Sequence, residues 1–586
     1  MAPTKTSHSV LSIKGILFVI VVIASILRLF HLSQVPVSLF GDELDVGYHA
    51  YSILKTGRDY SGNFMPLHLQ SLAEWRTPLY LYSAVPTVAL FGISPLGVRL
   101  PAALFGIATI PMFYLLVSEL IGGENESRKR KLGLFAAFLL AVSPWHIQYS
   151  RAAFEVTQLL FFLISGIYLF IRSLRTKGSL LWLSGISFGL MPWVYSTAKM
   201  FTPFLFFILG LVYLKEIFAL PKKTLLIGLL AAGLVLTPIT WSTLFGGGTQ
   251  RFNYISIFSD PTVEPEIGTA RGNDAHNRGE SGTGLNPTPI DKMFHNKFTY
   301  WGESLLQHSF MPFSTEFLFL TGDPNPRHSI EGMGEFYKFE IIGLLAGLAF
   351  FIAKSENRKS KILIALWIIL GVFPSSLTRD GGNHATRLIL ILPPLVFLVA
   401  YGFMYLLDNV NSLFKRPLVL LYVIVFVLSF VSYQHLYWVH NPSQSERWWH
   451  YGWGPAITEV KRIQSQYDNV VITSADEPPW IFFAGWYEYD PVLWHQGYPM
   501  KKHQLTGFGE VSYMGKFSFG SFEGKKGLYD WGKILDSKTL YLASAKEVNV
   551  NLIAEPERTP KDIQLLKSFA YPSGEPAFYL FTGISR

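Results

Sequence analysis

Twelve long runs of apolar residues constrain the fold of this 586-residue chain more than any other feature of its sequence. A helix of about 20 apolar residues crosses a bilayer. Only 15% of the residues are charged, whereas soluble globular domains average about 25%. The pattern therefore predicts an α-helical polytopic membrane protein and excludes disordered, collagen-like and disulfide-scaffold chains. The runs lie near 12–31, 77–94, 98–120, 132–145, 155–171, 179–196, 200–217, 224–243, 339–353, 361–377, 388–407 and 417–438.

Short basic clusters between these runs predict the orientation of the chain. Short loops rich in Lys and Arg stay in the cytoplasm. All the clusters fall on that side if the run 77–94, which contains Pro78 and Pro86, dips into the interface and does not cross. We therefore expect about 11 transmembrane helices in the plasma membrane, with a cytoplasmic N-terminus and an exterior C-terminus. The clusters are 128–131, Arg172/Arg175/Lys177, Lys215/Lys222/Lys223, Lys354/Arg358/Lys359/Lys361 and Lys415/Arg416.

Two long exterior loops, 32–97 and 244–338, interrupt this predicted transmembrane domain, which spans 1–439. The remaining part, 440–586, is no longer membrane-like. A helical pattern at 457–467 precedes strand-like patterns at 469–475, 539–545 and 578–583, which predicts an extracytoplasmic α/β domain.

Several chemistries are excluded or left open by the residues present. The chain has no cysteine, which excludes disulfides, thiolate metal sites and cysteine nucleophiles. No dinucleotide fingerprint or P-loop is found. The net charge of +8 is spread over the loop clusters, so we expect no nucleic-acid partner. The sequence requires no cofactor; the exterior histidines lack the i, i+4 spacing of a helical metal pair, and a divalent cation is left open.

An acidic motif opens the first exterior loop. Asp42, Glu43 and Asp45 follow the first apolar run directly. Charge at the bilayer interface is costly unless it has a use, so Asp42 and Glu43 are candidates for catalysis. The competing interpretation is structural: Asp42 would be the N-cap of a surface helix over 43–56 that Gly57 ends.

Other candidate residues lie at the exterior ends of later helices. Glu155 either takes part in catalysis or complements a helix N-terminus beside Arg151. Lys199, His384 and Arg387 are basic on the side that is otherwise poor in basic residues. They either contact a lipid phosphate or anchor the chain at the interface. Arg327 and His328 end a turn with two prolines, which either caps a site or is only a turn.

Three stretches carry a resemblance to a known family. They are Gly41-Asp42-Glu43, the run from Arg76-Thr-Pro78 to Arg99-Leu-Pro101, and the run from Ser143-Pro144 to Glu155. In order and spacing they resemble the polytopic glycosyltransferases of the protein O-mannosyltransferase type, a GT-C group that includes the lipid A aminoarabinose transferases. The resemblance extends over about residues 10–240.

This resemblance implies an inverting sugar transfer at the outer membrane face. The donor would be a sugar on a polyprenyl phosphate, and the acceptor a hydroxyl of a protein, a lipid or a glycan. Asp42 matches the acid proposed as the base and Glu43 its neighbour, while Glu155 matches the acid of the second exterior loop. Lys199 and Arg387 resemble positions near the lipid phosphate. The Arg76-Thr-Pro78 stretch departs from the Lys-Pro-Pro of lipid A transferases, which argues against a lipid A acceptor.

A second resemblance involves the motif after the last apolar run. Trp448-Trp449-His450-Tyr451-Gly452 is similar to the Trp-Trp-Asp-Tyr-Gly with which oligosaccharyltransferases hold an acceptor sequon. Trp449 and Tyr451 are therefore substrate-binding candidates, although an aromatic belt at the membrane exit also explains the motif. The alternatives to a transferase of the first kind are oligosaccharyltransferase-like transfer to a protein sequon, transport of a lipid-linked sugar, and a sensor with an exterior domain.

The topology is tested by reporter fusions. A reporter after Lys131 should lie in the cytoplasm, and one after Arg586 should lie outside, because the basic clusters then share one side of the membrane. Activity of paired cytoplasmic and exterior reporters measures this. An exterior signal after Lys131 would show that 77–94 crosses the bilayer, and the loop assignments would then be wrong.

Overall fold

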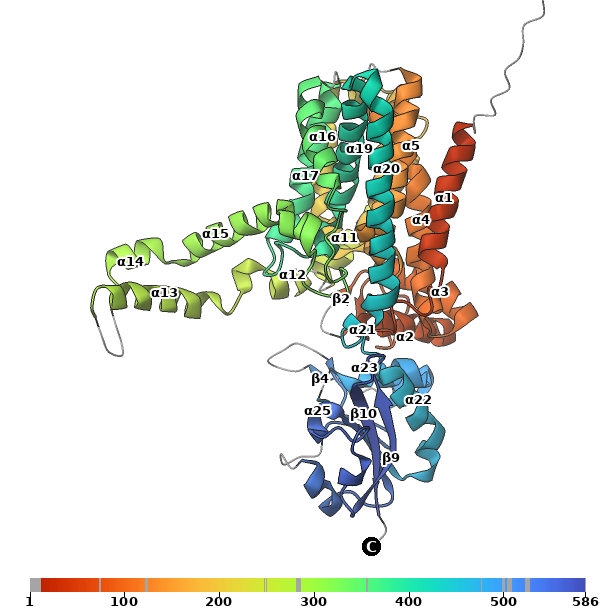
Figure 1. The fold of residues 1–586 in the computed structure, drawn as a ribbon, viewed down its shortest axis with the longest axis vertical. Helices are drawn as coiled ribbons and strands as arrows, with labels where there is room; N and C mark the ends of the chain where they lie inside the picture. The colour runs from red at the N-terminus through yellow and green to blue at the C-terminus, as the bar shows by residue number, and fades with distance from the viewer. Residues whose placement is uncertain are drawn as a thin grey trace, which may run out of the picture. The chain divides into compact units, whose positions relative to one another are not determined.

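Two compact units make up the chain in the computed structural model (Figure 1). The structure describes residues 12–72, 75–121, 125–246, 248, 250–280, 286–354, 357–475, 477–497, 501–502, 509–521 and 527–584. The first unit comprises Met1–Ala24, Ile107–His146 and Leu159–Ser429. The second comprises Ser25–Gly106, Ile147–Gln158 and Phe430–Arg586.

Helices occupy all twelve of the predicted apolar runs, which confirms a mainly helical polytopic architecture. Among the described residues, six helices are long and apolar enough to cross a membrane, or seven if the bent pair α5 and α6 is one span. The helix α3, in the run predicted to dip into the interface, is short and contains Pro86. The number of eleven transmembrane helices stays a prediction. The predicted domain boundary after residue 439 also stays a prediction.

The helices of the apolar runs are α1 (Ile13–Leu29), α3 (Leu79–Phe91), α4 (Pro95–Leu120), α5 (Glu126–Val142), α6 (Pro144–Ser150), α7 (Val156–Arg175), α8 (Leu181–Val194), α9 (Ser196–Val212), α10 (Leu214–Phe218), α11 (Lys222–Phe245), α16 (Glu340–Lys354), α17 (Arg358–Ser376), α18 (Ala385–Leu388), α19 (Leu392–Asn409) and α20 (Ser412–His435).

In the first unit, apolar helices pack pairwise with small residues between them. The pairs include α16 with α19, α11 with α8 and α17 with α9. Between α16 and α19 a side chain at Gly347 would meet the Leu398 carbonyl oxygen at 2.0 Å, and one at Gly402 would meet the Gly343 carbonyl oxygen at 2.0 Å. Such close backbone approach is typical of helix packing in lipid.

The predicted exterior loop 244–338 also lies in the first unit and contains helices of its own. They are α12 (Gln250–Ile255), α13 (Val263–Asn277), α14 (Pro289–Phe294) and α15 (Lys297–Phe310). Asn296 caps α15 by accepting the N–H of Thr299, as expected for an asparagine at this position. Figure 1 shows α13 and α15 running side by side.

A mixed β-sheet forms the centre of the second unit. Among the described strands, six pair in the order β6-β7-β3-β8-β10-β9. The strands β3, β8 and β10 coincide with the predicted strand patterns, and α22 overlaps the predicted helix over 457–463, so the α/β character is confirmed. The bounds are β3 (Asn469–Ile472), β6 (Tyr513–Met514), β7 (Phe517–Phe519), β8 (Thr539–Ser544), β9 (Ile563–Ala570) and β10 (Pro576–Gly583), with short pairs β1 (Leu69–Gln70) and β2 (Trp75–Arg76), and β4 (Lys501–Lys502) and β5 (Gly509–Glu510). Its helices are α21 (Asn441–Gln444), α22 (Trp453–Ile463), α23 (Pro479–Tyr487), α24 (Pro491–Gly497) and α25 (Ala545–Val548).

The helix predicted after the acidic motif is α2 (Gly41–Thr56), and two details of the prediction are wrong. Phe40 is the N-cap residue, so Asp42 lies inside the first turn and does not cap the helix. The helix is also not a surface helix as predicted, because Leu44 and Tyr48 are fully buried in a hydrophobic core. The end of the helix is confirmed: Gly57 has φ of 71° and donates its N–H to the Ile53 carbonyl.

The buried face of α2 packs against α3 and against α23 and α24 of the C-terminal region. The contact with α23 is close, because a Cβ on Gly485 would meet Leu44 Cδ2 at 2.7 Å. In addition, the Tyr48 hydroxyl donates to the Tyr489 carbonyl at 3.1 Å. Within the second unit, the segment 32–97 and the C-terminal region therefore share one core.

Substitution of Gly485 tests this contact. Gly485→Ala should lower the free energy of unfolding by about 1–3 kcal/mol, the usual cost of overpacking. The loss should be smaller in a Leu44→Ala background, where the clashing methyl group is gone. Chemical denaturation in detergent measures both. Gly520→Ala is the matched control, since a Cβ there meets nothing within 4 Å; equal losses at the two glycines would contradict the packing.

Candidate functional site

The three acids of α2 lie in three different environments of the second unit. Glu43 and Asp45 are fully buried, whereas the side chain of Asp42 is 53% exposed. Successive residues of an α-helix point about 100° apart, so one helical turn aims these carboxylates at different surroundings. Each acid can therefore have a separate role.

Glu43 forms a buried, bidentate ion pair with Arg99 of α4. Arg99 Nε donates to Oε1 at 2.8 Å and Nη2 to Oε2 at 2.7 Å. The Ala153 N–H also donates to Oε1 at 2.8 Å, and Arg99 Nη1 binds the Pro36 carbonyl at 2.8 Å. Both oxygens of the carboxylate therefore accept hydrogen bonds from the protein. The structure thus favours a positioning role for Glu43, which fixes α2 to the loop before it and to residue 153.

Asp45 is the centre of a second buried network that the sequence analysis did not single out. Its carboxylate accepts hydrogen bonds from the Tyr60 hydroxyl at 2.7 Å, the Ser71 hydroxyl at 2.8 Å and Arg76 Nη1 at 3.1 Å. Burial raises the pKa of Asp45, and the charge of Arg76 opposes this shift. Burial also lowers the pKa of the neighbouring His49 to about 3, so this ring is neutral. Asp45 lies three residues after Asp42 and therefore on the same side of the helix. This spacing is the sequence feature that could have pointed to Asp45.

Arg76 connects the buried Asp45 to the exposed Asp42. Its Nη2 lies 3.7 Å from Asp42 Oδ2, and Nη1 donates to the Asp42 carbonyl at 3.2 Å. The guanidinium therefore holds the first turn of α2 while half of the Asp42 side chain stays open to solvent. A carboxylate held in this way can still accept a proton from a bound hydroxyl group.

Arg151, predicted to bind substrate, is buried and serves the protein itself. Its guanidinium donates to the Leu27 carbonyl and the Val35 carbonyl, both at 2.9 Å, and to the Tyr437 hydroxyl at 2.9 Å. These bonds favour a structural role over contact with a substrate. Glu155 is half-buried and directly precedes α7, where an acid complements the helix N-terminus.

Trp449 of the aromatic motif is also buried. Its ring packs edge-on against Phe40 at 5.3 Å, and the Arg99 guanidinium lies 5.3 Å from the ring centre. This placement disfavours the predicted acceptor contact, because the indole is in the core. Tyr451 is half-buried and donates its backbone N–H to the Glu446 carbonyl at 3.1 Å.

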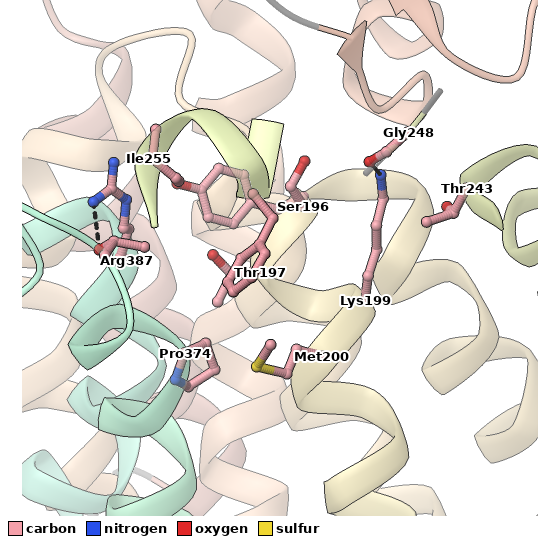
Figure 2. A pocket seen from close by; sticks show the side chains of 12 residues that line it. Ser196, Thr197, Lys199, Met200, Thr243, Gly248, Ile255, Pro374 and Arg387 are labelled. Atoms are coloured by element: carbon pink, nitrogen blue, oxygen red, sulfur yellow. Dashed lines mark hydrogen bonds between the residues drawn. The ribbon is translucent and has the colours of Figure 1, made fainter. Parts of the chain in front are cut away.

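In the first unit, the two predicted phosphate-binding cations line the same cavity. The cavity has a volume of about 420 Å³. Figure 2 shows Lys199, in the first turn of α9, and Arg387, in α18, on opposite sides of it. Lys199 Nζ donates to the Gly248 carbonyl at 3.2 Å. The remaining wall is largely apolar and is formed by Tyr195, Ser196, Thr197, Met200, Thr243, Gly248, Phe252, Ile255, Pro374 and Thr378.

Arg387 is held in this wall by neighbours on the preceding turn. Its Nη1 donates to the Thr378 hydroxyl at 2.7 Å and to the Asp380 carboxylate. The side chain is only 7% exposed. A planar guanidinium fixed on one edge can present its other donors to a phosphate in a defined orientation.

The turn with two prolines has a defined structure as well. The Asn325 N–H donates to Asp323 Oδ1 at 2.8 Å, which is a typical Asx turn. His328 Nδ1 lies 2.9 Å from Asp323 Oδ2. Burial opposes ionisation of Asp323, but the hydrogen bond and charge of His328 and the charge of His384 lower its pKa overall. Arg327 is half-buried, and its N–H donates to Asn325 Oδ1 at 3.0 Å.

Part of the chain matches a known protein family. Residues 76–241 match the family model of dolichyl-phosphate-mannose-protein mannosyltransferase. This confirms the predicted resemblance over that segment, which contains Arg76, Arg99, Glu155 and Lys199; Asp42 and Arg387 lie outside it. No curated protein sequence matches the chain.

Several solved structures are similar to the chain, including the following three. One is ArnT from Cupriavidus metallidurans bound to undecaprenyl phosphate, with 10% identity, 97% of each chain covered and a TM-score of 0.49. Another is the oligosaccharyltransferase of Archaeoglobus fulgidus in complex with Zn and sulfate, with 11% identity, 96% of this chain and 72% of that chain covered and a TM-score of 0.49. The third is the Saccharomyces cerevisiae protein O-mannosyltransferase Pmt1–Pmt2 complex bound to the sugar donor, with 18% identity, 43% and 36% covered and a TM-score of 0.30.

The different environments of the adjacent acids lead to a stability prediction. Glu43→Gln should lower the free energy of unfolding by about 3–5 kcal/mol, because it leaves the buried Arg99 without its charge partner. Asp42→Asn, the matched control one residue away, should change it by less than about 0.5 kcal/mol, as is usual for an exposed side chain. Chemical denaturation in detergent compares them. If both variants were as stable as the wild type, the ion pair would not be holding α2.

Proposed function

We propose that the chain is an inverting membrane glycosyltransferase that moves a sugar from a polyprenyl phosphate to an acceptor hydroxyl at the outer membrane face. The observation that carries the proposal is the cavity of about 420 Å³ lined by both Lys199 and Arg387. The match of residues 76–241 to a family named for a dolichyl-phosphate sugar donor supports the same donor class. The exterior position of these residues rests on the predicted topology.

The leaving group of such a donor is a phosphate anion, so the reaction needs cations near it more than a proton donor. Lys199 and Arg387 would bind the phosphate oxygens through charge-assisted hydrogen bonds. Their attraction grows as the bond from the anomeric carbon to the phosphate oxygen breaks, and this stabilises the transition state. The apolar part of the cavity wall suits the first isoprene units of the lipid.

The acceptor hydroxyl has a high pKa and benefits from a carboxylate base within hydrogen-bond reach. We assign this role to Asp42, whose side chain is half-exposed while its neighbours Glu43 and Asp45 are occupied by Arg99, Tyr60, Ser71 and Arg76. The hydroxyl oxygen attacks the anomeric carbon, the proton passes to Asp42, and the phosphate leaves with the bonding electrons. One direct displacement inverts the anomeric configuration.

For the acceptor, the matched family points to protein hydroxyl groups; a lipid or glycan hydroxyl would use the same chemistry. Transfer to a protein sequon by the aromatic motif is less favoured, because Trp449 is buried against Phe40 and Arg99. A transporter of lipid-linked sugar would bind the same donor without breaking its glycosidic bond, and a transfer assay separates the two functions.

Purified protein should transfer sugar from a synthetic polyprenyl-phosphate sugar to a serine- or threonine-containing peptide. Asp42→Asn should reduce kcat about 10²–10⁴-fold, the usual contribution of a positioned base, with little change in donor KM. Lys199→Ala and Arg387→Ala should weaken use of the donor, and Arg387→Lys should restore it only partly, because lysine lacks the planar fork. NMR of the product should show the inverted anomer.

The matched controls are Asp468→Asn, an exposed acid, and Lys297→Ala, an exposed lysine of the loop 244–338; both should behave as wild type. Wild-type turnover by Asp42→Asn would remove it from the reaction, and Glu155 would then be the acid to test. If Lys199→Ala and Arg387→Ala both left the donor KM and kcat unchanged, the two residues would not bind the phosphate. Interfacial anchoring would then be the better explanation of both. Donor binding without transfer would favour a transporter.

A further inference from the structure

Three metal-binding side chains from two stretches of the first unit meet at one point. Asp323 and His328 come from the turn with two prolines, and His384 comes from the residue before α18. One ligand atom of each lies within 4.8 Å of the others. The side chains are 4%, 13% and 18% exposed, respectively. No local spacing in the sequence indicates this group, because 56 residues separate His328 from His384.

Two imidazole nitrogens and one carboxylate oxygen are ligands typical of divalent cations that are neither hard nor soft. Two imidazoles and one carboxylate suit Zn²⁺, with the fourth position left to water, and the same set also suits Fe²⁺. Around a tetrahedral Zn²⁺ with bonds of about 2.0–2.1 Å, neighbouring ligand atoms lie about 3.3 Å apart. Asp323 Oδ2 lies 2.9 Å from His328 Nδ1 and 4.0 Å from His384 Nδ1. These two distances lie on either side of the required separation, and all three ligand atoms lie within 4.8 Å of one another.

The surroundings orient these ligands as in known metal sites. Asp323 accepts the Asn325 N–H on Oδ1 and the Ala385 N–H on Oδ2, each at 2.8 Å, which fixes its carboxylate. His384 turns Nδ1 toward Asp323, while its Nε2 lies 3.7 Å from Asp380 Oδ2. A carboxylate on the far nitrogen of a ligating histidine is the usual second layer of a zinc site. Asp380 is 61% exposed, so this side of His384 lies next to solvent.

We propose that Asp323, His328 and His384 form a binding site for one Zn²⁺-type divalent cation, with a water molecule as the fourth ligand. The ion would fasten the turn 323–328 to the start of α18. Asp380, which contacts both His384 and Arg387, would then connect the metal site to the wall of the cavity. The metal site is inferred from its three ligands alone, and it does not depend on the proposed sugar transfer.

Metal binding to the full-length protein tests the proposal. Untagged protein in detergent is stripped with a chelator, incubated with Zn²⁺ in the presence of millimolar Mg²⁺ and desalted, and its zinc content is measured by mass spectrometry. We expect the wild type to contain one more Zn²⁺ per chain than His328→Ala, His384→Ala or Asp323→Asn. Asp380→Asn should weaken binding 10–100-fold, as loss of a second-layer carboxylate does elsewhere.

His295→Ala is the matched control, because His295 pairs with Asp274 at 2.9 Å in the same exterior loop; its zinc content should equal that of the wild type. X-ray absorption of the zinc-loaded wild type needs no variant and should show two imidazole ligands and oxygen donors. The proposal would be wrong if the wild-type protein retained no Zn²⁺, or if His295→Ala lost as much zinc as the ligand variants. It would also be wrong if X-ray absorption showed a number of imidazole ligands other than two. A protein that binds one Zn²⁺ but does not transfer sugar would still support the metal site. That result would count only against the proposed function.

Discussion

The buried ion pair between Glu43 and Arg99 is the constraint on which the arrangement of the second unit depends. A carboxylate and a guanidinium withdrawn from water are stable only when each satisfies the other, and loss of one partner leaves an uncompensated charge. Here the pair also binds the Ala153 N–H and the Pro36 carbonyl. Three segments that are distant in sequence must therefore meet before either charge can be buried, and their meeting sets the direction of the first turn of α2.

The exposure of Asp42 follows from that direction. Because Glu43 is fixed toward Arg99, its neighbour one residue earlier turns away by about 100° and reaches solvent beside Arg76. Asp45, two residues after Glu43, turns instead into the network with Tyr60 and Ser71. Three acids in four residues thus divide into an inner pair that builds the helix and one outer carboxylate that is accessible.

Much of the fold was predictable because its signals are local. Each of the twelve apolar runs contains a helix, and the alternation at 469–475 and 539–545 marks strands β3 and β8. Lys199 and Arg387 could be singled out because the predicted topology puts them on the side where other basic residues are scarce. That they line one cavity could not be derived, since this depends on the packing of α9 and α18.

The errors and omissions share a different cause. The competing interpretation of Asp42 as a helix cap rested on the preference for an acid before a helical pattern, but Phe40 holds that position. Trp449 looked like an interfacial aromatic residue, yet Phe40 and Arg99 cover it. Asp45 with Arg76, and Asp323 with His384, are pairs made by tertiary structure, and neither partner shows the contact in its own sequence neighbourhood.

The hydrogen bond from Tyr48 to Tyr489 has a consequence for the synthesis of the chain. Its partners are 441 residues apart, and ribosomes add about 5–20 residues per second. Helix α2 therefore waits roughly 20–90 s for the C-terminal segment that covers it. During this interval Leu44 and Tyr48 lack the C-terminal part of their core, so the packing of α2 is completed only when translation is nearly finished.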